Sequence, residues 1–260
     1  MPRIFIPNIP TKENQISITG EKAKYLTTVL RYKKGEELIV FDGEGNCLRT
    51  NILRADRKEV IAEVLERFAC NTESPINIIL VQGLLKGQKM DMVIQKATEL
   101  GVKEIIPVIT ERSQPRETRK VARWRKIAEE ASRQSGRSMI PLVYEPKEFN
   151  QFLVQLNQLR RNGETEKGRH GRMYGFIFWE EGGISLKEAV PKISLSHIRR
   201  VTDSPIYLVI GPEGGFTKEE IAIAKEKGFI VTTLGKRILR AETAAISAIT
   251  IVQFLLGDLG

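Results

Sequence analysis

Two stretches near the C-terminal end decide the fold, namely IYLVIGPEGGFTKEE at residues 206–220 and LGKRILRAETAAISAI at residues 234–249. In each, a strand-like apolar run is followed by a glycine-containing turn and then by a segment with helical spacing. Thr217 and Glu220 form a capping-box pattern at the start of the first helix. Neither turn matches GxxxxGK[ST] or GxGxxG, so the usual phosphate loops are excluded. Open α/β sheets bind ligands at the carboxyl ends of their strands, so both turns can meet at one sheet edge.

From residue 76 onward, apolar strands alternate with helical segments, which predicts an α/β layer with a mostly parallel sheet. The predicted strands are residues 76–82, 104–109, 174–179, 206–211 and 230–234, and the predicted helices are residues 91–100, 118–133, 217–227 and 241–256. The apolar faces of the first two helices are Met92, Ile94, Ala97 and Leu100, and Val121, Trp124, Ala128 and Ala131. The charged, glycine-rich residues 160–172 are expected to form an exposed loop.

The first 70 residues have a different pattern of predicted secondary structure, with short β-rich runs separated by turn signals and one or two helical turns near residues 21–30. This pattern predicts a small β-barrel. The polar stretch at residues 69–75 ends in proline and is a predicted hinge. We therefore expect two domains, at residues 1–72 and 73–260.

Composition excludes several classes of protein. Of the 260 residues, 41% are hydrophobic and 28% charged, which is typical of a globular chain and not of a disordered one. No apolar run is long enough to span a bilayer, and the start lacks a secretory signal pattern. Cys47 and Cys70 form no CxxC motif, so we expect two free thiols in a reducing compartment. His170 and His197 offer little for a metal site or a Ser-His-Asp triad.

The charge favours a polyanionic partner, because 41 Lys and Arg stand against 32 Asp and Glu, a net charge of +9. Residues 112–137 alone contain nine Lys or Arg and three Glu. This stretch has two interpretations, a solvated helix face or a surface that binds phosphates.

Four stretches, taken in order along the chain, resemble one family. They are KGQKMDMVIQKATELGV at residues 86–102, TERS at residues 110–113 and the two C-terminal stretches quoted above. They are similar to the RsmE family of 16S rRNA uridine N3-methyltransferases, within the SPOUT superfamily. The resemblance runs from about residue 20 to the C-terminus and includes VLRYKKGEELIVFDGEG at residues 29–45.

The resemblance implies a PUA-like RNA-binding β-barrel followed by a SPOUT-type α/β methyltransferase domain with a C-terminal trefoil knot. It further implies a cytoplasmic homodimer that uses S-adenosyl-L-methionine, without a metal, to methylate N3 of a uridine in the 16S rRNA of the small ribosomal subunit.

The chemistry that this activity requires points to roles for individual residues. The expected cofactor-binding residues are Trp179, Glu180, Gly211, Pro212, Gly214, Gly215, Leu234, Gly235, Ile238, Leu239 and Thr243, the last of which is equally suited to capping its helix. Arg240 is expected to stabilise negative charge on the uracil or to hold a phosphate, and Glu213 or Glu242 to accept the N3 proton. Candidate RNA contacts are Arg3, Arg31, Lys86, Lys89, Arg112, Arg116 and Arg119.

Two alternatives remain open at this point. Related knotted proteins share the cofactor turns, so the same chemistry on another RNA, such as 2′-O-methylation of tRNA, is the second hypothesis. The third is a ribosome-assembly factor that binds RNA without catalysis, which the intact glycine turns disfavour.

Overall fold

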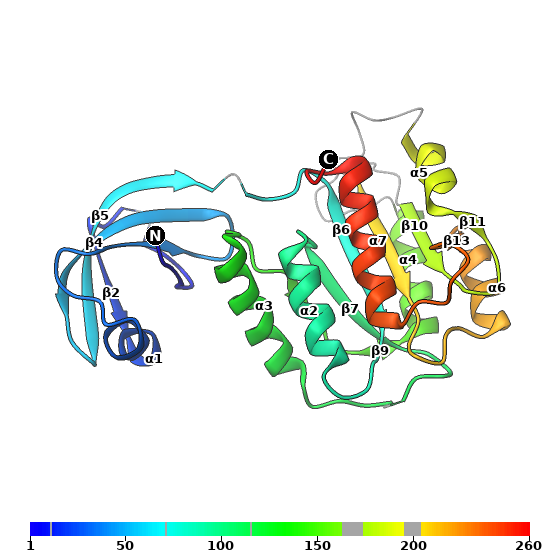
Figure 1. Ribbon diagram of the computed structural model, residues 1–260, viewed down its shortest axis with the longest axis horizontal. Helices are drawn as coiled ribbons and strands as arrows, with labels where there is room; N and C mark the ends of the chain where they lie inside the picture. The colour runs from blue at the N-terminus through cyan, green and yellow to red at the C-terminus, as the bar shows by residue number, and fades with distance from the viewer. Residues whose placement is uncertain (11, 71, 115, 163–173, 195–203) are drawn as a thin grey trace. The chain divides into compact units, whose positions relative to one another are not determined.

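A computed structural model describes the chain except for residues 11, 71, 115, 163–173 and 195–203 (Figure 1). Unit 1 comprises Met1–Glu73 and Glu129–Ile140, and unit 2 comprises Ser74–Ala128 and Pro141–Gly260. His170 and His197 lie outside the described residues. Within the described ranges, no helix has the length and apolar character needed to cross a bilayer.

Unit 2 is built on a parallel sheet of eight strands. Its strands are β6 (Asn77–Gly83), β7 (Glu104–Ile109), β8 (Leu142–Val143), β9 (Lys147–Glu148), β10 (Tyr174–Phe178), β11 (Ile184–Ser185), β12 (Pro205–Ile210) and β13 (Ile230–Thr233). Its helices are α2 (Lys89–Glu99), α4 (Phe149–Asn162), α5 (Leu186–Ser194), α6 (Lys218–Glu226) and α7 (Ala241–Leu256), and α3 (Val121–Ser135) runs from unit 2 into residues of unit 1.

The strand order is β11-β13-β10-β12-β6-β7-β8, with β9 paired to β7, and every pairing is parallel. Strands of such a sheet are buried on both faces and therefore read as continuous apolar runs, as β12 does. On one face, Ile79, Val81 and Val209 pack against the aromatic and aliphatic side chains of α4 and α6. On the other face, α7 contacts β6, β12 and α2, and Figure 1 shows α2 and α7 side by side.

Most predicted elements of unit 2 are confirmed within a residue or two at each end. The apolar face of α3 is confirmed, because Val121, Trp124, Ala128 and Ala131 are all buried. The capping box of α6 is also confirmed. The assignment of Met92 to the buried face of α2 was wrong: Met92 is 48% exposed, and Met90 and Val93 are buried instead.

The sequence analysis missed helices α4 and α5. Residues 160–162, expected to begin a loop, instead complete α4, and residues 163–172 of that predicted loop lie outside the described part of the chain.

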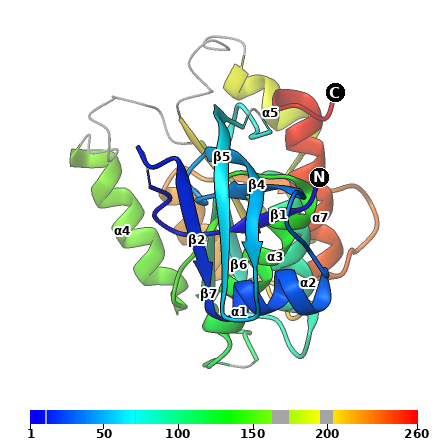
Figure 2. The ribbon, with the colours of Figure 1, turned by 90° about the vertical axis from the view of Figure 1, so that its left-hand side faces the viewer.

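Unit 1 contains a five-stranded sheet of order β1-β3-β4-β5-β2, seen face-on in Figure 2. The elements are β1 (Arg3–Phe5), β2 (Gln15–Thr19), α1 (Gly20–Lys24), the π-helical turn η1 (Tyr25–Val29), β3 (Glu37–Phe41), β4 (Asn46–Ala55) and β5 (Glu59–Ala69). Alternation places Ile16 and Ile18 of β2 in the core, beside Ala23 of α1 and Leu26 of η1. Closure of this sheet into a barrel stays a prediction.

The expectation of two free thiols was wrong, because Cys47 and Cys70 form a disulfide. Cys47 of β4 pairs with Phe68 of β5, so Cys70, two residues beyond Phe68, is its diagonal neighbour on the same face. That closeness depends on the register of the two strands, which the spacing of the cysteines along the chain does not reveal.

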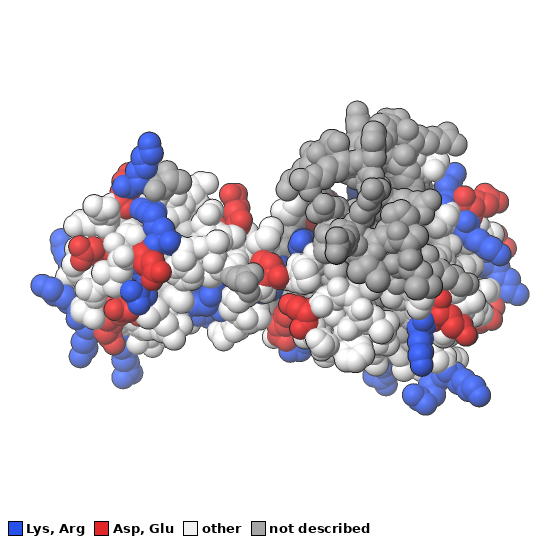
Figure 3. Space-filling model, turned by 90° about the horizontal axis from the view of Figure 1, so that it is seen from above, with Lys and Arg blue, Asp and Glu red and all other residues white. Residues whose placement is uncertain are grey.

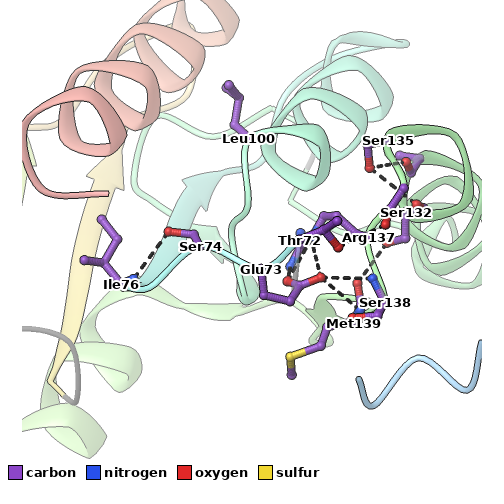
Figure 4. Close-up of polar contacts among 12 residues, drawn as sticks. Thr72, Glu73, Ser74, Ile76, Leu100, Ser132, Ser135, Arg137, Ser138 and Met139 are labelled. Atoms are coloured by element: carbon purple, nitrogen blue, oxygen red, sulfur yellow. Dashed lines mark hydrogen bonds and ion pairs between the residues drawn. The ribbon is translucent and has the colours of Figure 1, made fainter. Parts of the chain in front are cut away.

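The described part of the predicted hinge is held by a buried ion pair. Arg137, only 3% exposed, donates to the Glu73 carboxylate through Nη2 at 2.7 Å and through Nε at 3.1 Å. The backbone N–H groups of Ser138 and Met139 donate to the same carboxylate at 3.0 and 3.1 Å (Figure 4). Four donors therefore converge on one carboxylate and tie Glu73 to the segment that follows α3.

We expect Glu73→Ala to lower the free energy of unfolding by about 3 kcal/mol, because it leaves the buried Arg137 guanidinium without its counter-charge. Glu66→Ala is the matched control, since Glu66 forms an exposed pair with Arg49 and its loss should cost less than about 1 kcal/mol. Urea unfolding followed by circular dichroism measures both values, and equal values for the two variants would contradict the expectation.

Candidate active site

A cavity of about 520 Å³ lies in unit 2, at the carboxyl ends of β10 and β12. The end of β10, the turn after β12, the segment before α7 and the start of α2 all contribute to its walls. The lining residues are Lys89, Phe178, Glu180, Ile210, Gly211, Pro212, Glu213, Gly215, Ile238, Leu239, Arg240, Ala241 and Ala244. Apolar walls with a few charged groups at the mouth are typical of a small-molecule site.

A smaller cavity of about 80 Å³ shares five lining residues with the first, namely Phe178, Glu180, Ile238, Leu239 and Ala244. Its remaining wall includes Leu234 and Gly235 from the turn after β13. Since β13, β10 and β12 are consecutive in the sheet, their carboxyl ends meet at one edge. The structure thus brings the two glycine turns together, as the sequence analysis expected.

Close backbone approach explains the glycines of the first turn. A Cβ atom on Gly215, whose φ is +68°, would lie 2.5 Å from Oε1 of Glu180. A Cβ on Gly83, at the end of β6, would lie 2.5 Å from the nitrogen of Pro212. The buried Gln82 side chain donates to the Gly211 carbonyl at 3.2 Å. Strand β6 therefore packs directly against the turn that follows β12.

The TERS segment at residues 110–113 supports the same turn from its other side. Arg112 donates to the carbonyl of Gly214 at 3.1 Å. Glu220, buried in the first turn of α6, accepts from the Glu111 N–H at 2.9 Å and from the Thr217 N–H at 2.9 Å. Gly214 contacts Arg112 and does not line either cavity described above.

Glu213 is held in an ion pair in the lining of the larger cavity. Its Oε1 lies 2.9 Å from Nζ of Lys89 and accepts the backbone N–H of Lys86 at 3.1 Å. Partial burial raises the pKa of the Glu213 carboxyl, but hydrogen bonds from Lys89, from its own backbone and from Lys86 outweigh that effect and leave this pKa below its usual value. Glu213 is therefore a carboxylate anion at neutral pH.

The other expected catalytic groups lie around the start of α7. Arg240 is the N-cap residue of α7 and lines the larger cavity, and its side chain makes no hydrogen bond or ion pair with the residues described. Neither Glu242 nor Thr243 lines either cavity, and no side chain caps this helix, Thr243 included. One oxygen of Glu242 is buried without a partner among the described residues.

Trp179 and Glu180 follow β10 and line the smaller cavity, as expected of residues at the end of that strand. The indole nitrogen of Trp179 is buried and has no acceptor within the described chain. A buried N–H without a partner is costly, so this atom is suited to donate to a bound ligand.

The candidate RNA contacts fall into two groups. Arg31, Lys86 and Arg119 are exposed, and their side chains make no polar contact with the part of the chain described. The others are engaged within the protein: Arg3 with the Arg137 carbonyl, Lys89 with Glu213, Arg112 with Gly214 and Arg116 with the Glu111 carbonyl.

The basic stretch at residues 112–137 is partly neutralised by the protein itself. Four of its nine Lys and Arg, at positions 123, 125, 133 and 137, form ion pairs with Asp91, Glu145, Glu130 and Glu73 respectively. On the face of unit 1 that Figure 3 shows, Lys and Arg likewise alternate with Asp and Glu. These pairs favour a solvated, salt-bridged surface at those four arginines, and both interpretations stay open for the remaining Lys and Arg of the stretch.

Sequence reasoning missed several residues that line the larger cavity. Phe178 and Ile210 are the last residues of their strands, directly before the turns, and this position was a readable signal. Lys89 was expected only as an RNA contact. Lys89 lies beside Glu213 because β6, which precedes Lys89, is next to β12, which precedes Glu213. Local sequence patterns do not predict this order of strands.

Comparison with known proteins agrees with this architecture. The sequence profile of an RNA methyltransferase domain matches residues 72–253, and that of an RNA methyltransferase PUA domain matches residues 18–65. Ribosomal RNA small subunit methyltransferase E of Bacillus subtilis is 30% identical over 245 residues, covering 92% of this chain and 89% of the relative. Its counterpart in Buchnera aphidicola is 32% identical over 263 residues, covering 99% and 95%.

A solved structure extends the comparison to three dimensions. Ribosomal RNA small subunit methyltransferase E of Neisseria gonorrhoeae, crystallised with S-adenosyl methionine bound, superposes with a TM-score of 0.85 at 32% identity, and all of both chains is covered. By the domain profile and by these relatives of matching length, this chain belongs to the ribosomal RNA small subunit methyltransferase E family.

Proposed function

We propose that this protein transfers a methyl group from S-adenosyl-L-methionine to N3 of a uridine in 16S rRNA of the small ribosomal subunit. The observation that carries the proposal is the pair of adjoining cavities formed by the two glycine turns, in a chain whose relatives are named as small-subunit rRNA methyltransferases. Family membership favours this function over the tRNA and assembly-factor alternatives.

The residues present fit the proposed cofactor. Phe178, Ile210 and Leu239 supply the apolar walls that an adenine ring requires, and the unpartnered indole N–H of Trp179, at the adjoining smaller cavity, supplies a hydrogen-bond donor. The carboxylate of Glu180, next to Gly215, is suited to accept hydrogen bonds from ribose hydroxyls. Gly211, Pro212, Gly215, Leu234, Gly235 and Ile238 complete the proposed binding set.

When bound, S-adenosyl-L-methionine supplies a methyl group that its sulfonium already makes electrophilic, so the protein needs to prepare only the uracil. The N3 proton has a pKa well above 7, and negative charge must develop as N3 becomes nucleophilic. Arg240 has no partner of its own in the described structure and faces the cavity, so we assign it to the uracil oxygen that carries this charge.

The finer architecture is part of the proposal. We propose that residues 1–72 act as a PUA-like RNA-binding barrel and residues 73–260 as a SPOUT-type methyltransferase domain with a C-terminal trefoil knot. The chain leaves β13 on one side of β10, and α7 then packs against β12 and β6 on the other side. Residues 234–240 therefore cross beside the turn after β12, which supports a threaded crossing. We place the enzyme in the cytoplasm, where its ribosomal substrate is assembled.

The direct test is mass spectrometry of small-subunit RNA incubated with the protein and isotope-labelled cofactor. Labelled N3-methyluridine at one position is the expected product. Label confined to a tRNA ribose, or no label in any RNA, would contradict the proposal.

We expect Arg240→Met to lower turnover roughly 100-fold to 1,000-fold, as removal of a donor to a developing oxyanion usually does. Cofactor affinity should change little, because the walls that hold the cofactor in this proposal remain. Single-turnover kinetics and calorimetry measure the two quantities separately, and a loss confined to cofactor affinity would remove Arg240 from the chemical step.

We also propose that the protein is a homodimer that uses the outer surface of α7. Phe254 and Leu255 near the end of α7 are 62% and 42% exposed. Leu259, just past the helix end, is 49% exposed. Exposed apolar side chains gathered at one helix end mark a surface that associates.

Phe254→Asp should therefore shift the solution mass from that of two chains toward that of one, because a charge in an apolar contact is costly. Val154→Asp on α4 is the matched control, since Val154 is 50% exposed but lies on a different helix. Light scattering at several concentrations gives the masses. A single-chain mass for the unmodified protein, or an unchanged mass for Phe254→Asp, would refute this surface as the interface.

A further inference from the structure

Two cations and two anions line the larger cavity among the residues described. The cations are Lys89, at the start of α2, and Arg240, before α7, and the anions are Glu180 and Glu213. The two cations come from distant parts of the chain and face one space. Among these groups, the two cations are the ones that stabilise a negative charge on a ligand placed between them.

Glu213 is a poor acceptor for a proton from uracil. Its carboxylate already accepts from Lys89 and from the Lys86 N–H, and these bonds hold its pKa below the usual value. Proton transfer to it would break the ion pair as well as run strongly uphill. Glu242, the other carboxylate considered from the sequence, does not line the cavity.

Lys89 differs from the other paired lysine of the same helix. Lys96 pairs with Glu99 one turn away, at 2.8 Å, on the surface of α2. Lys89 instead pairs with a carboxylate 124 residues away in sequence, at the wall of the cavity. The ion pair with Glu213 therefore fixes the position of the Lys89 ammonium group relative to the proposed methyl-donor site.

Resting on the proposed function, we propose that the cavity ionises the target uracil before methyl transfer, with Lys89 and Arg240 stabilising the N3 anion. Lys89 donates to a carbonyl oxygen of the uracil, and Glu213 is a positioning residue that holds Lys89 in place. Neither Glu213 nor Glu242 serves as general base, and Glu180 keeps its proposed place at the cofactor ribose.

The chemical step balances without a further reactant. The N3–H bond breaks and its proton passes to solvent water, leaving the electron pair on N3 and the charge shared with the carbonyl oxygens. N3 then forms a bond to the methyl carbon, and the electron pair of the broken carbon–sulfur bond stays on sulfur. An anion and a sulfonium thus give N3-methyluridine and a neutral thioether.

The test is a ¹⁹F NMR titration that does not depend on turnover. An rRNA fragment carries 5-fluorouridine at the position mapped by mass spectrometry, because the fluorine shift reports ionisation at N3. The fragment is titrated with pH alone and when bound to the protein together with S-adenosylhomocysteine. We expect binding to lower the apparent pKa of the base by about one unit or more, as nearby opposite charges do.

Two variants of α2 show which lysine lowers the pKa of the uracil. Lys89→Met should abolish most of the pKa lowering while the RNA remains bound. Lys96→Met removes an equally charged lysine of the same helix that does not line the cavity, and should keep the full lowering. An unchanged pKa on binding to the unmodified protein, or equal titrations for the two variants, would overturn the inference.

Glu213→Gln separates positioning from base catalysis. We expect it to reduce turnover less than Lys89→Met does, because the ammonium group remains and only its anchor is lost. A loss as large as that of Lys89→Met or larger, with the lowered pKa of the uracil retained, would make Glu213 the base and refute the proposed mechanism. If mass spectrometry finds no N3-methyluridine with the unmodified protein, the proposed function itself fails, whatever the titration shows.

Discussion

The close approach of two backbone turns at one edge of a parallel sheet is the constraint on which the rest of the site depends. The turn after β12 and the turn after β13 meet because their strands lie on either side of β10. Gly215 lets the turn after β12 lie against the segment that follows β10, since a Cβ atom there would lie 2.5 Å from Oε1 of Glu180. All three strands end at the same edge, so residues far apart in sequence share one cavity.

The remaining contacts of unit 2 hold this arrangement from outside. Gln82 binds the Gly211 carbonyl, and Arg112 binds the Gly214 carbonyl. Glu220 joins the cap of α6 to the backbone of Glu111. Each of these side chains satisfies a backbone group of a turn, which rigidifies the turns without filling the cavity. The ammonium group of Lys89 is held in a similar way, because it pairs with the carboxylate of Glu213 in the turn after β12.

Local patterns predicted those features that depend on neighbours in sequence. Helical spacing correctly placed Val121, Trp124, Ala128 and Ala131 in the core, and the capping box located the start of α6. Helix α4 was also readable, because Phe149, Phe152, Leu153 and Leu156 recur at helical spacing and are all buried. Its omission was an error of interpretation and not a limit of the sequence.

Other features depend on register or sheet order, and local patterns do not contain them. The disulfide between Cys47 and Cys70 requires the pairing of β4 with β5. Ile94 and Ala97 of α2 are buried as expected, but the exposure of Met92 and the burial of Met90 and Val93 show that the buried side of α2 is shifted from the one expected. Lys89 reaches Glu213 because β6 neighbours β12, although 124 residues separate the two side chains.

Calorimetry of S-adenosyl-L-methionine binding to two glycine variants tests the central claim most directly. Gly215→Ala and Gly20→Ala impose alanine on nearly equal φ angles, +68° and +67°, but only the first places a Cβ against Glu180 at the cavity, while the second meets open space in unit 1. The account predicts at least a tenfold loss of affinity, about 1.4 kcal/mol, for Gly215→Ala and none for Gly20→Ala. Unchanged binding by Gly215→Ala would show that the methyl donor does not lie between the two turns.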